Sequence, residues 1–219
     1  MPLRRESRAR SVTPPLAPEL LIHAYSIGVF PMADPDTGEI GWYSPDPRAL
    51  FPLDDFHVPR NVARLTRQGR FEIRTDTRFE QVMRACAFDR SRDNRCWISE
   101  EMIRAYAQLH RHGLAHSVEA WRNGQLVGGL YGVHLGAAFF GESMFCRPDL
   151  GGSGASKVCL VHLVRMLREG GFMLLDTQFT NPHVEQFGCV EIPREAYLER
   201  LRLAIQADGA WPAPGTMNA

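Results

Sequence analysis

The chain has 219 residues, of which 44% are hydrophobic and 23% charged, so it can bury a sizeable core as one large domain or two small ones. Lysine and arginine together number 25, as do aspartate and glutamate together. The resulting zero net charge argues against a protein coated in positive charge for duplex nucleic acid, although a local basic patch for a folded RNA remains compatible with it. The five cysteines include no C-x-x-C pair, which argues against a disulfide framework or a four-thiolate zinc site.

The N-terminal residues predict a tail followed by a short helix. Residues 1–16 are basic and poor in large apolar residues, so we expect them to be disordered. They lack the apolar segment of a secretory signal, and no run of about 20 apolar residues predicts a membrane span, so we expect a cytoplasmic protein. Residues 19–25 predict a helix that ends at Gly28. The prolines and aromatic residues of 30–48 predict a packed, irregular segment.

The rest of the first half predicts helices with little strand. A helix over 58–68 would carry Arg60, Arg64 and Arg67 on one stripe, because these residues follow the helical spacing. They are a candidate phosphate-facing set for an RNA, and a solvated helix face is the alternative. The other elements that we expect are a strand at 71–73 and helices at 79–86 and 100–110, the last with Ser99 as its N-cap.

The second half has the signals of a sheet followed by helix and strand. Asn123-Gly124 supplies a hairpin turn between two strands. The helix over 155–168 is apolar on most sides, so we expect it to be largely buried, and the apolar run 172–176 suits a central strand. The remaining expected elements are strands at 116–121, 126–133 and 137–144 and a helix at 193–206 with Pro193 in its first turn.

This order of elements predicts an α/β (α+β) protein with two lobes. The helix-rich N-terminal lobe would span 17–112 and the second lobe 113–208, followed by a C-terminal tail at 209–219. Three neighbouring histidines, His110, His112 and His116, could be metal ligands. No Asp or Cys completes the set in the sequence around them, so we expect solvated histidines and no metal.

Several short motifs occur in a fixed order between residues 19 and 203. The most distinctive are W-Y-S-P-D-P-R at 42–48 and G-E-S-M-F at 141–145; A-Y-S-I-G-V-F-P-M at 24–32 and L-L-D-T-Q-F at 174–179 are others. In this order and spacing the chain resembles the leucyl/phenylalanyl-tRNA–protein transferase family. One departure is the segment 146–154, which is longer than the connection usual in the family.

The resemblance implies an aminoacyltransferase of the acyltransferase class. It would move Leu or Phe, and some Met, from aminoacyl-tRNA to the α-amino group of proteins that begin with Arg or Lys. The new peptide bond would mark the acceptor for N-end rule protein degradation. The implied partners are Leu-tRNA, Phe-tRNA and these acceptor proteins, with no cofactor, no metal and no membrane, and we expect a monomer. The resemblance also implies an N-acetyltransferase-like C-terminal lobe with a mixed sheet.

Asp176 and Gln178 follow an apolar run at spacing i, i+2, so they would face the same side if the strand continues through them. The reaction joins an amine to an ester that is already activated, so it needs positioning and proton transfer more than a cofactor. Gln178 could accept a hydrogen bond from the attacking amine, and Asp176 could orient Gln178 or take up the proton. The resemblance implies that this pair is central. The alternative is that Asp176 only caps the following helix or turn.

Glu142 is a third candidate catalytic residue. A carboxylate in an apolar strand is costly unless it is paired. Glu142 could pair with the positive charge of the incoming acceptor. An internal salt bridge is the alternative, and the resemblance favours the functional role.

The transferred side chain needs an apolar pocket, and the end of the tRNA needs a stacking partner. An aromatic residue at any one position is more often plain core. Two neighbouring aromatic residues, Trp42 and Tyr43, could stack on the terminal adenine or could instead anchor the first lobe. The candidate substrate-binding residues are Trp97, Tyr106, Phe139, Ser143 and Leu175, together with Trp42 and Tyr43.

Two other functions are open on sequence alone. The glycine-rich segment 151–154 precedes a helix, and with Arg147 it resembles the coenzyme A loop of N-acetyltransferases, where helix N–H groups bind pyrophosphate. Binding of acetyl-CoA would identify this alternative. A non-catalytic tRNA-binding module would bind charged and uncharged tRNA alike, but zero net charge and the expected burial of Glu142 and Asp176 argue against it.

Overall fold

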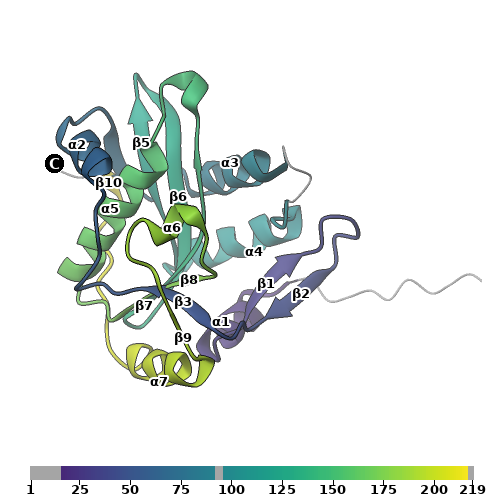
Figure 1. Ribbon diagram of the computed structural model, residues 1–219. Coiled ribbons are helices and arrows are strands. Elements are labelled where there is room, and N and C mark those ends of the chain that lie inside the picture. Colours follow the sequence, from purple (N-terminus) through teal and green to yellow (C-terminus); the bar gives the residue numbers. More distant parts are fainter. Residues whose placement is uncertain (1–15, 92–95, 217–219) are drawn as a thin grey trace, which may run out of the picture.

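The computed structural model describes residues 16–91 and 96–216, and the tail expected at 1–16 lies outside these residues except for Leu16, which is buried. A central sheet has the strand order β10-β4-β5-β6-β7-β8-β3-β9 (Figure 1). Strands β7 and β8 pair in parallel and the other neighbours are antiparallel, so the sheet is mixed and the α+β class is confirmed. The strands are β3 (Arg48–Phe51), β4 (Glu72–Thr75), β5 (Ala115–Arg122), β6 (Gln125–Leu135), β7 (Ala138–Cys146), β8 (Leu174–Gln178), β9 (Val190–Ile192) and β10 (Gly215–Thr216).

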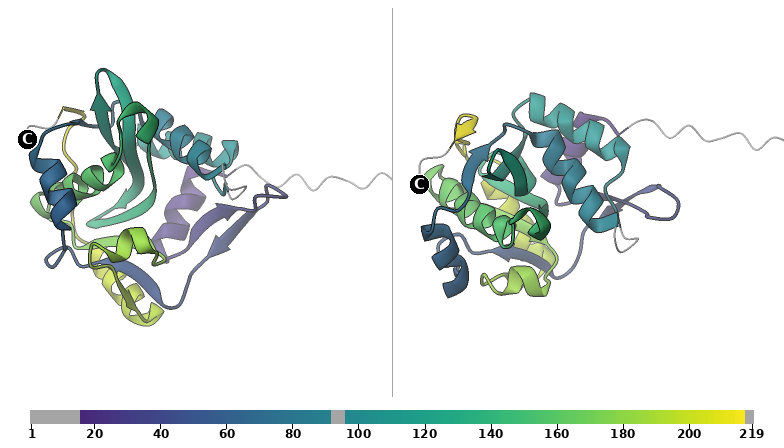
Figure 2. Two further views of the ribbon diagram at one scale, coloured as in Figure 1. Left: turned by 45° about the horizontal axis from the view of Figure 1, so that its top comes forward. Right: turned by 90° about the horizontal axis from the view of Figure 1, so that it is seen from above.

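Helices cover both faces of this sheet, as the two views of Figure 2 show. One face carries α5 (Ala155–Glu169), with α2 (Arg60–Arg67) packed against it. The other face carries α1 (Pro18–Ser26), α3 (Phe79–Ser91) and α4 (Glu100–Arg111). Each face has its own apolar core, so the sheet is buried on both sides along most of β5, β6 and β7.

Most of the predicted elements are present, and their local signals act as expected. Ser99 caps α4 by accepting a hydrogen bond from the backbone N–H of Met102. Asn123 and Gly124 have φ values of 51° and 74°, as the turn of a two-residue hairpin requires. The final helix is α7 (Arg194–Ala204), but Pro193 is its N-cap and not a first-turn residue.

The segment 30–48, expected to be irregular, contains regular strands. β1 (Phe30–Ala33) and β2 (Ile40–Tyr43) form a separate two-stranded hairpin, and β3 begins at Arg48. Pro31 in β1 is tolerated because a two-stranded hairpin consists of edge strands, which need not donate from every N–H group. The prediction of an irregular segment was therefore wrong.

The lobe boundary expected at residue 113 does not divide the sheet. Strands β3 and β4 come from before this residue and pair with β8 and β5 from after it. The C-terminal residues also pack on the sheet: β10 pairs with β4, and Trp211 stacks on His116 and Phe139 with centroid distances of 4.3 and 5.3 Å. No helix in the described part of the chain is long and apolar enough to span a bilayer.

Candidate active site

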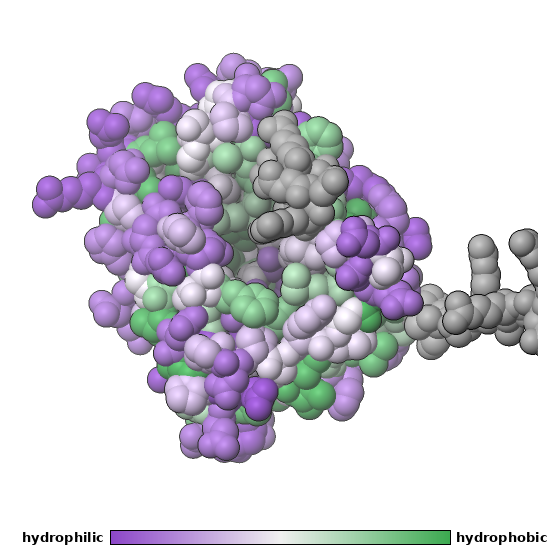
Figure 3. Space-filling view, turned by 45° about the vertical axis from the view of Figure 1, so that its right-hand side comes forward, coloured by the Kyte–Doolittle hydropathy of each residue, from purple (hydrophilic) through white to green (hydrophobic). Residues whose placement is uncertain are grey.

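A cavity of about 400 Å³ lies where β7 and β8 separate. The two strands pair only as far as Phe140 and Asp176, although β7 continues to Cys146 and β8 to Gln178. Residues of both strand ends line the cavity, and Figure 3 shows a hollow with hydrophobic residues gathered around it. Glu142 is the extra residue of a β-bulge, because Gly132 pairs with Gly141 and Tyr131 with Ser143. Bulges re-aim side chains in this way beside many active sites.

Asp176 is held by a dense set of hydrogen bonds. It forms a bidentate ion pair with Arg48, whose Nη2 lies 2.6 Å from Oδ2 and whose Nε lies 3.0 Å from Oδ1. Tyr197 donates its hydroxyl to Oδ2 at 2.8 Å, and the backbone N–H of Gln178 donates to Oδ1 at 2.9 Å. Arg48 also donates to the carbonyl oxygen of Gly28. Asp176 thus caps the turn at Gln178, as the alternative interpretation expected, and it is also anchored to β3 and α7 through Arg48 and Tyr197.

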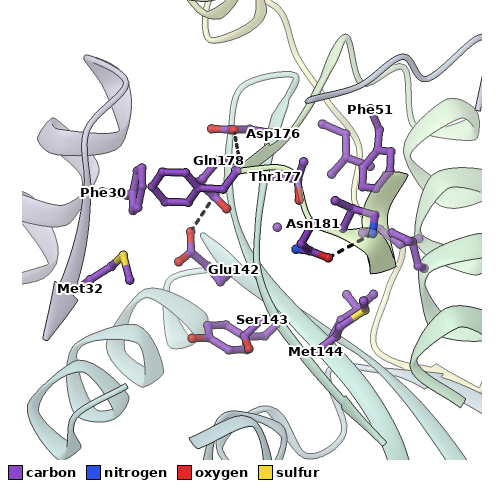
Figure 4. Close-up of a pocket in the computed structure, with 18 of the residues that line it drawn as sticks. Phe30, Met32, Phe51, Glu142, Ser143, Met144, Asp176, Thr177, Gln178 and Asn181 are labelled. Carbon is purple, nitrogen blue, oxygen red and sulfur yellow. Dashed lines mark hydrogen bonds between the residues drawn. The ribbon is translucent and has the colours of Figure 1, made fainter. Parts of the chain in front are cut away.

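Gln178 has a left-handed backbone with φ of 61°, at the point where β8 ends. Such a φ is uncommon for a residue other than glycine, and residues of this kind cluster at functional sites. In this conformation the side-chain amide reaches Glu142, with its Nε2 3.5 Å from Oε1 (Figure 4). Asp176, Gln178 and Glu142 therefore lie together at one end of the cavity, linked through the backbone N–H and the side-chain amide of Gln178.

Glu142 lies deep in the cavity beside two buried tyrosines. The hydroxyl of Tyr25 donates to Oε1 at 2.7 Å, and the hydroxyls of Tyr25 and Tyr106 lie 2.5 Å apart. Burial raises the pKa of Glu142 to about 8; the hydrogen bond from Tyr25 and the charge of Arg48 oppose this rise, and the charge of Asp176 adds to it. A carboxyl with a pKa near neutrality suits proton transfer.

The other end of the cavity is apolar. It reaches between the sheet and α5, where buried side chains of the core cluster on that face line it. Apolar pockets of this size typically hold a large side chain or a small ligand. The apolar residues at this end are Phe51, Leu130, Leu160, Leu163, Leu175 and Val184.

Some of the predicted substrate-binding residues line the cavity and others do not. Trp97, Ser143 and Leu175 line it. Tyr106 is fully buried behind Tyr25 and does not reach the cavity. Phe139 is also fully buried, because alternate residues of a strand point to opposite faces and its ring packs against Trp211 and Phe172. These two predicted substrate-binding residues thus lie in the core and not in the cavity wall.

Trp42 and Tyr43 lie on the β1–β2 hairpin with 39% and 44% of their surfaces exposed. Neither lines the cavity, but Tyr43 packs against Phe30, which does, with the ring centroids 6.2 Å apart. Tyr43 is therefore accessible beside the cavity, and Trp42 is exposed on the same strand. Phe30 also contacts Phe179, which is 48% exposed and follows Gln178.

The three arginines predicted on one helical stripe are exposed on α2. Arg64 lines a second cavity of about 420 Å³ between α2 and the start of α5, and Arg60 and Arg67 do not. Arg70 and Lys157 line the same cavity, so it is basic. Lys157 already donates to the side chain of Gln186 at 3.0 Å.

Two of the three predicted histidines, His110 and His116, lie together with an aspartate that the sequence pattern did not indicate, and His112 is not part of this cluster. Asp76, His110 and His116 each have one ligand atom within 4.8 Å of the others, and His116 is buried and not solvated. These atoms are already used: Nδ1 of His116 donates to Asp76 at 2.8 Å, as does Nε1 of Trp211. Nδ1 of His110 bonds the carbonyl oxygen of Ala115. The cluster therefore ties the C-terminal segment to β5.

Three residues of the site were not predicted, namely Tyr25, Arg48 and Tyr197. Arg48 and Tyr197 hold Asp176, and Tyr25 holds Glu142. Arg48 ends the W-Y-S-P-D-P-R motif, so its position in a distinctive motif was a usable signal. The tyrosines lie in helices that otherwise indicate only core.

The family model described as "Leucyl/phenylalanyl-tRNA protein transferase" matches residues 50–202, and the model of the N-terminal domain of that family matches residues 15–46. A leucyl/phenylalanyl-tRNA–protein transferase from Gloeobacter violaceus (strain ATCC 29082 / PCC 7421) is 57% identical over 190 residues, which are 87% of this chain and 94% of that protein. The enzyme of that name from Salinibacter ruber (strain DSM 13855 / M31) is 53% identical over 196 residues, 90% of this chain and 83% of that protein.

Among solved structures, a ribosomal-protein-alanine N-acetyltransferase from Brucella melitensis biovar Abortus 2308 covers 65% of this chain and 96% of its own, with 16% identity and a TM-score of 0.37. A score this low carries no argument about the fold. The two family models and the high identity over nearly the whole chain do identify the protein. The chain belongs to the leucyl/phenylalanyl-tRNA–protein transferase family, and it is an aminoacyl-tRNA–protein transferase, an enzyme of the acyltransferase class.

Proposed function

We propose that this protein transfers Leu or Phe, and some Met, from aminoacyl-tRNA to the α-amino group of proteins that begin with Arg or Lys. The reaction would take place in the cytoplasm and would mark the acceptor for degradation by the N-end rule pathway. The observation that carries this proposal is the cavity between β7 and β8, which joins an apolar end to a polar end formed by Glu142 and Gln178.

The apolar end fits the side chain that is transferred. Leu163 and Leu175 approach it from α5 and from β8, and Trp97 and Met32 line its approach. A pocket built of aliphatic side chains discriminates against one missing or extra methylene by only about 1–3 kcal/mol. Leu, Phe and Met are therefore all acceptable to it, whereas a charged side chain would lose its hydration there without gaining a partner.

The polar end fits the acceptor. Gln178 donates its amide Nε2 to Glu142, which leaves the amide oxygen free to accept a hydrogen bond from the attacking amine. Glu142 offers a carboxylate to the positive charge of an N-terminal Arg or Lys. Asp176 has the role of orienting Gln178 through its backbone, since its own oxygens are occupied by Arg48, Tyr197 and that backbone N–H.

The tRNA would approach over the exposed residues around the cavity. Trp42 and Tyr43 are exposed on the β1–β2 hairpin, where they are accessible for stacking on the terminal adenine. The exposed arginines of α2 offer charges to the phosphates of the acceptor stem. We assign this role to Arg60, Arg64 and Arg67, and Arg70 and Lys157 extend the same basic surface.

The test is transfer of labelled Phe from Phe-tRNA to a peptide beginning with Arg. The same peptide with an acetylated N-terminus is the control, and a parallel reaction contains acetyl-CoA in place of the tRNA. Label on the free amine alone is expected. Acetylation without Phe transfer would overturn the proposal. In the same assay, Asp176→Ala and Gln178→Ala should lower turnover far more than tRNA affinity, and an equal loss of tRNA binding would contradict the roles assigned to these residues.

A further inference from the structure

The two carboxylates of the site, Asp176 and Glu142, differ in how many of their hydrogen-bond acceptor positions are unoccupied. Both oxygens of Asp176 are occupied, since Oδ1 accepts from Arg48 and Gln178 and Oδ2 accepts from Arg48 and Tyr197. Its side chain has no exposed surface. A proton could reach Asp176 only if one of these donors left, and the loss of a partner from a buried charge is strongly unfavourable.

Glu142 is different. Its Oε1 accepts from Tyr25 and from the amide of Gln178, but within 16–91 and 96–216 no group bonds Oε2. The residue is half-buried because one side of it faces the cavity, where the side chains of Glu142 and Gln178 point toward each other (Figure 4). An amine that donates one hydrogen to Gln178 therefore has an open carboxylate oxygen beside it for a second.

We propose that Glu142 is the general base of the transfer reaction and that Tyr25 and Tyr106 are positioning residues that hold its carboxylate. This inference rests on the proposed function. The amine nitrogen forms a bond to the ester carbonyl carbon, and one N–H proton passes to Oε2 of Glu142. The bond between this carbon and the ribose oxygen then breaks with its electron pair on the oxygen. Glu142 returns the proton there, which leaves an amide, a ribose hydroxyl and a regenerated carboxylate.

The groups around Glu142 suit this role. Tyr25 and Tyr106 approach from α1 and α4, Asp176 and Gln178 from β8, and Arg48 from β3. The raised pKa of about 8 places the acid and base forms of Glu142 close in free energy near neutral pH, which is the condition for returning a proton after taking it. Roughly a tenth of the protein would have Glu142 ionised at pH 7, so turnover should rise toward pH 8.

The first test asks whether Glu142 acts as a base or only binds the positively charged side chain of the acceptor's first residue. Wild type and Glu142→Gln are compared on two peptides, one beginning with Arg and one with citrulline, its neutral analogue. A general base predicts a loss of kcat of about 100-fold or more with the citrulline peptide as well as with the Arg peptide. If the loss is confined to the Arg peptide, Glu142 only binds positive charge and the inference is overturned. If wild type transfers nothing to the Arg peptide, the proposed function itself has failed.

The second test uses the pH dependence of kcat/KM. The acceptor amine also titrates near pH 7.7–8.0, so an ascending limb alone does not identify Glu142. Tyr25→Phe removes a hydrogen bond that lowers the pKa of Glu142, and it leaves the amine unchanged. The limb should therefore move to higher pH in Tyr25→Phe. A limb that stays in place in this variant, and also persists in Glu142→Gln, belongs to the amine and would overturn the inference.

Discussion

Arg48 and Asp176, which lie 128 positions apart in the sequence, form an ion pair whose side chains are 1% and 0% exposed. The pair joins β3 to β8, and the guanidinium of Arg48 is further held between the rings of Phe30 and Tyr197. Because Asp176 also binds the backbone N–H of Gln178, the ion pair fixes the residue whose side-chain amide faces Glu142 in the cavity. The core of the fold and the geometry of the site thus depend on the same contact.

Arg48→Leu should lower the free energy of unfolding by about 3–5 kcal/mol, because the variant leaves Asp176 buried without its charge partner. Arg48→Lys should retain only part of this stability. Its ammonium keeps the charge partner of Asp176 but cannot make two parallel hydrogen bonds to the carboxylate. Urea denaturation measures both. Arg74→Leu is the control, because Arg74 pairs with Glu72 at the surface, and it should cost no more than about 1 kcal/mol. Equal losses for Arg48→Leu and Arg74→Leu would contradict this account.

The left-handed backbone of Gln178 predicts a difference between two substitutions. Glycine adopts φ of 61° without strain, whereas alanine pays about 1–2 kcal/mol. Gln178→Gly should therefore be at least as stable as Gln178→Ala, although glycine usually destabilises a strand. Both variants lose the side-chain amide, so both should lose turnover. Thermal unfolding and transfer assays on the two proteins check this, and a less stable glycine variant would argue that the conformation is not required.

The elements set by local signals were predictable from sequence, and the pairing of distant elements was not. The cap at Ser99 and the Asn123-Gly124 turn act within a few residues, so their pattern indicated α4 and the β5–β6 hairpin correctly. Asp176 and Gln178 could be placed at a strand end. The partner of Asp176 is chosen by the order of strands in the sheet, which no local pattern encodes.

The same limit explains the other differences. The hairpin of β1 and β2 consists of four-residue strands containing a proline, and such short segments carry turn signals as strong as their strand signals. Phe139 and Tyr106 are both fully buried, and an aromatic residue in an apolar segment has the same sequence pattern whether it faces a cavity or the core. Asp76 meets His110 and His116 only because β4 pairs with β5.

The apolar end of the cavity should set the size of the transferred side chain. Leu163→Phe adds volume on α5 inside the cavity, so it should lower transfer of Phe more than transfer of Leu. Met166→Phe is the matched control, because Met166 is buried in the same helix but does not line the cavity. Both variants bear a similar overpacking cost of about 1–3 kcal/mol. Transfer rates with Phe-tRNA and Leu-tRNA give the ratio of Phe transfer to Leu transfer. If this ratio is unchanged in Leu163→Phe, the side chain of the transferred amino acid does not bind at this end of the cavity.

The exposed arginines of α2 should contribute to tRNA affinity through counterion release. Replacing Arg60, Arg64 and Arg67 by alanine should weaken tRNA binding. It should also reduce the slope of log affinity against log salt by about 2–3, since each phosphate contact contributes about 0.7–0.9. The control replaces three exposed arginines elsewhere, Arg165, Arg200 and Arg202, which changes the net charge equally. Binding titrations at several salt concentrations measure both slopes. The same slope change in both triple variants would show that total charge matters and α2 does not.

Glu142 should cost the protein stability at alkaline pH. Its pKa is raised from 4.5 to about 8 in the folded state, so between these values the folded protein binds a proton that the unfolded chain releases. The free energy of unfolding must therefore fall as pH rises through this window, by up to about 1.4 kcal/mol per pH unit. Glu142→Gln cannot ionise, so its stability relative to wild type should grow from pH 5 to pH 8 and then level off. Thermal unfolding across this pH range measures the difference in stability. Glu199→Gln is the control, because Glu199 is an exposed residue of α7 and the stability of this variant should follow that of wild type. A Glu142→Gln curve parallel to wild type at every pH would mean that Glu142 is ionised in the resting protein.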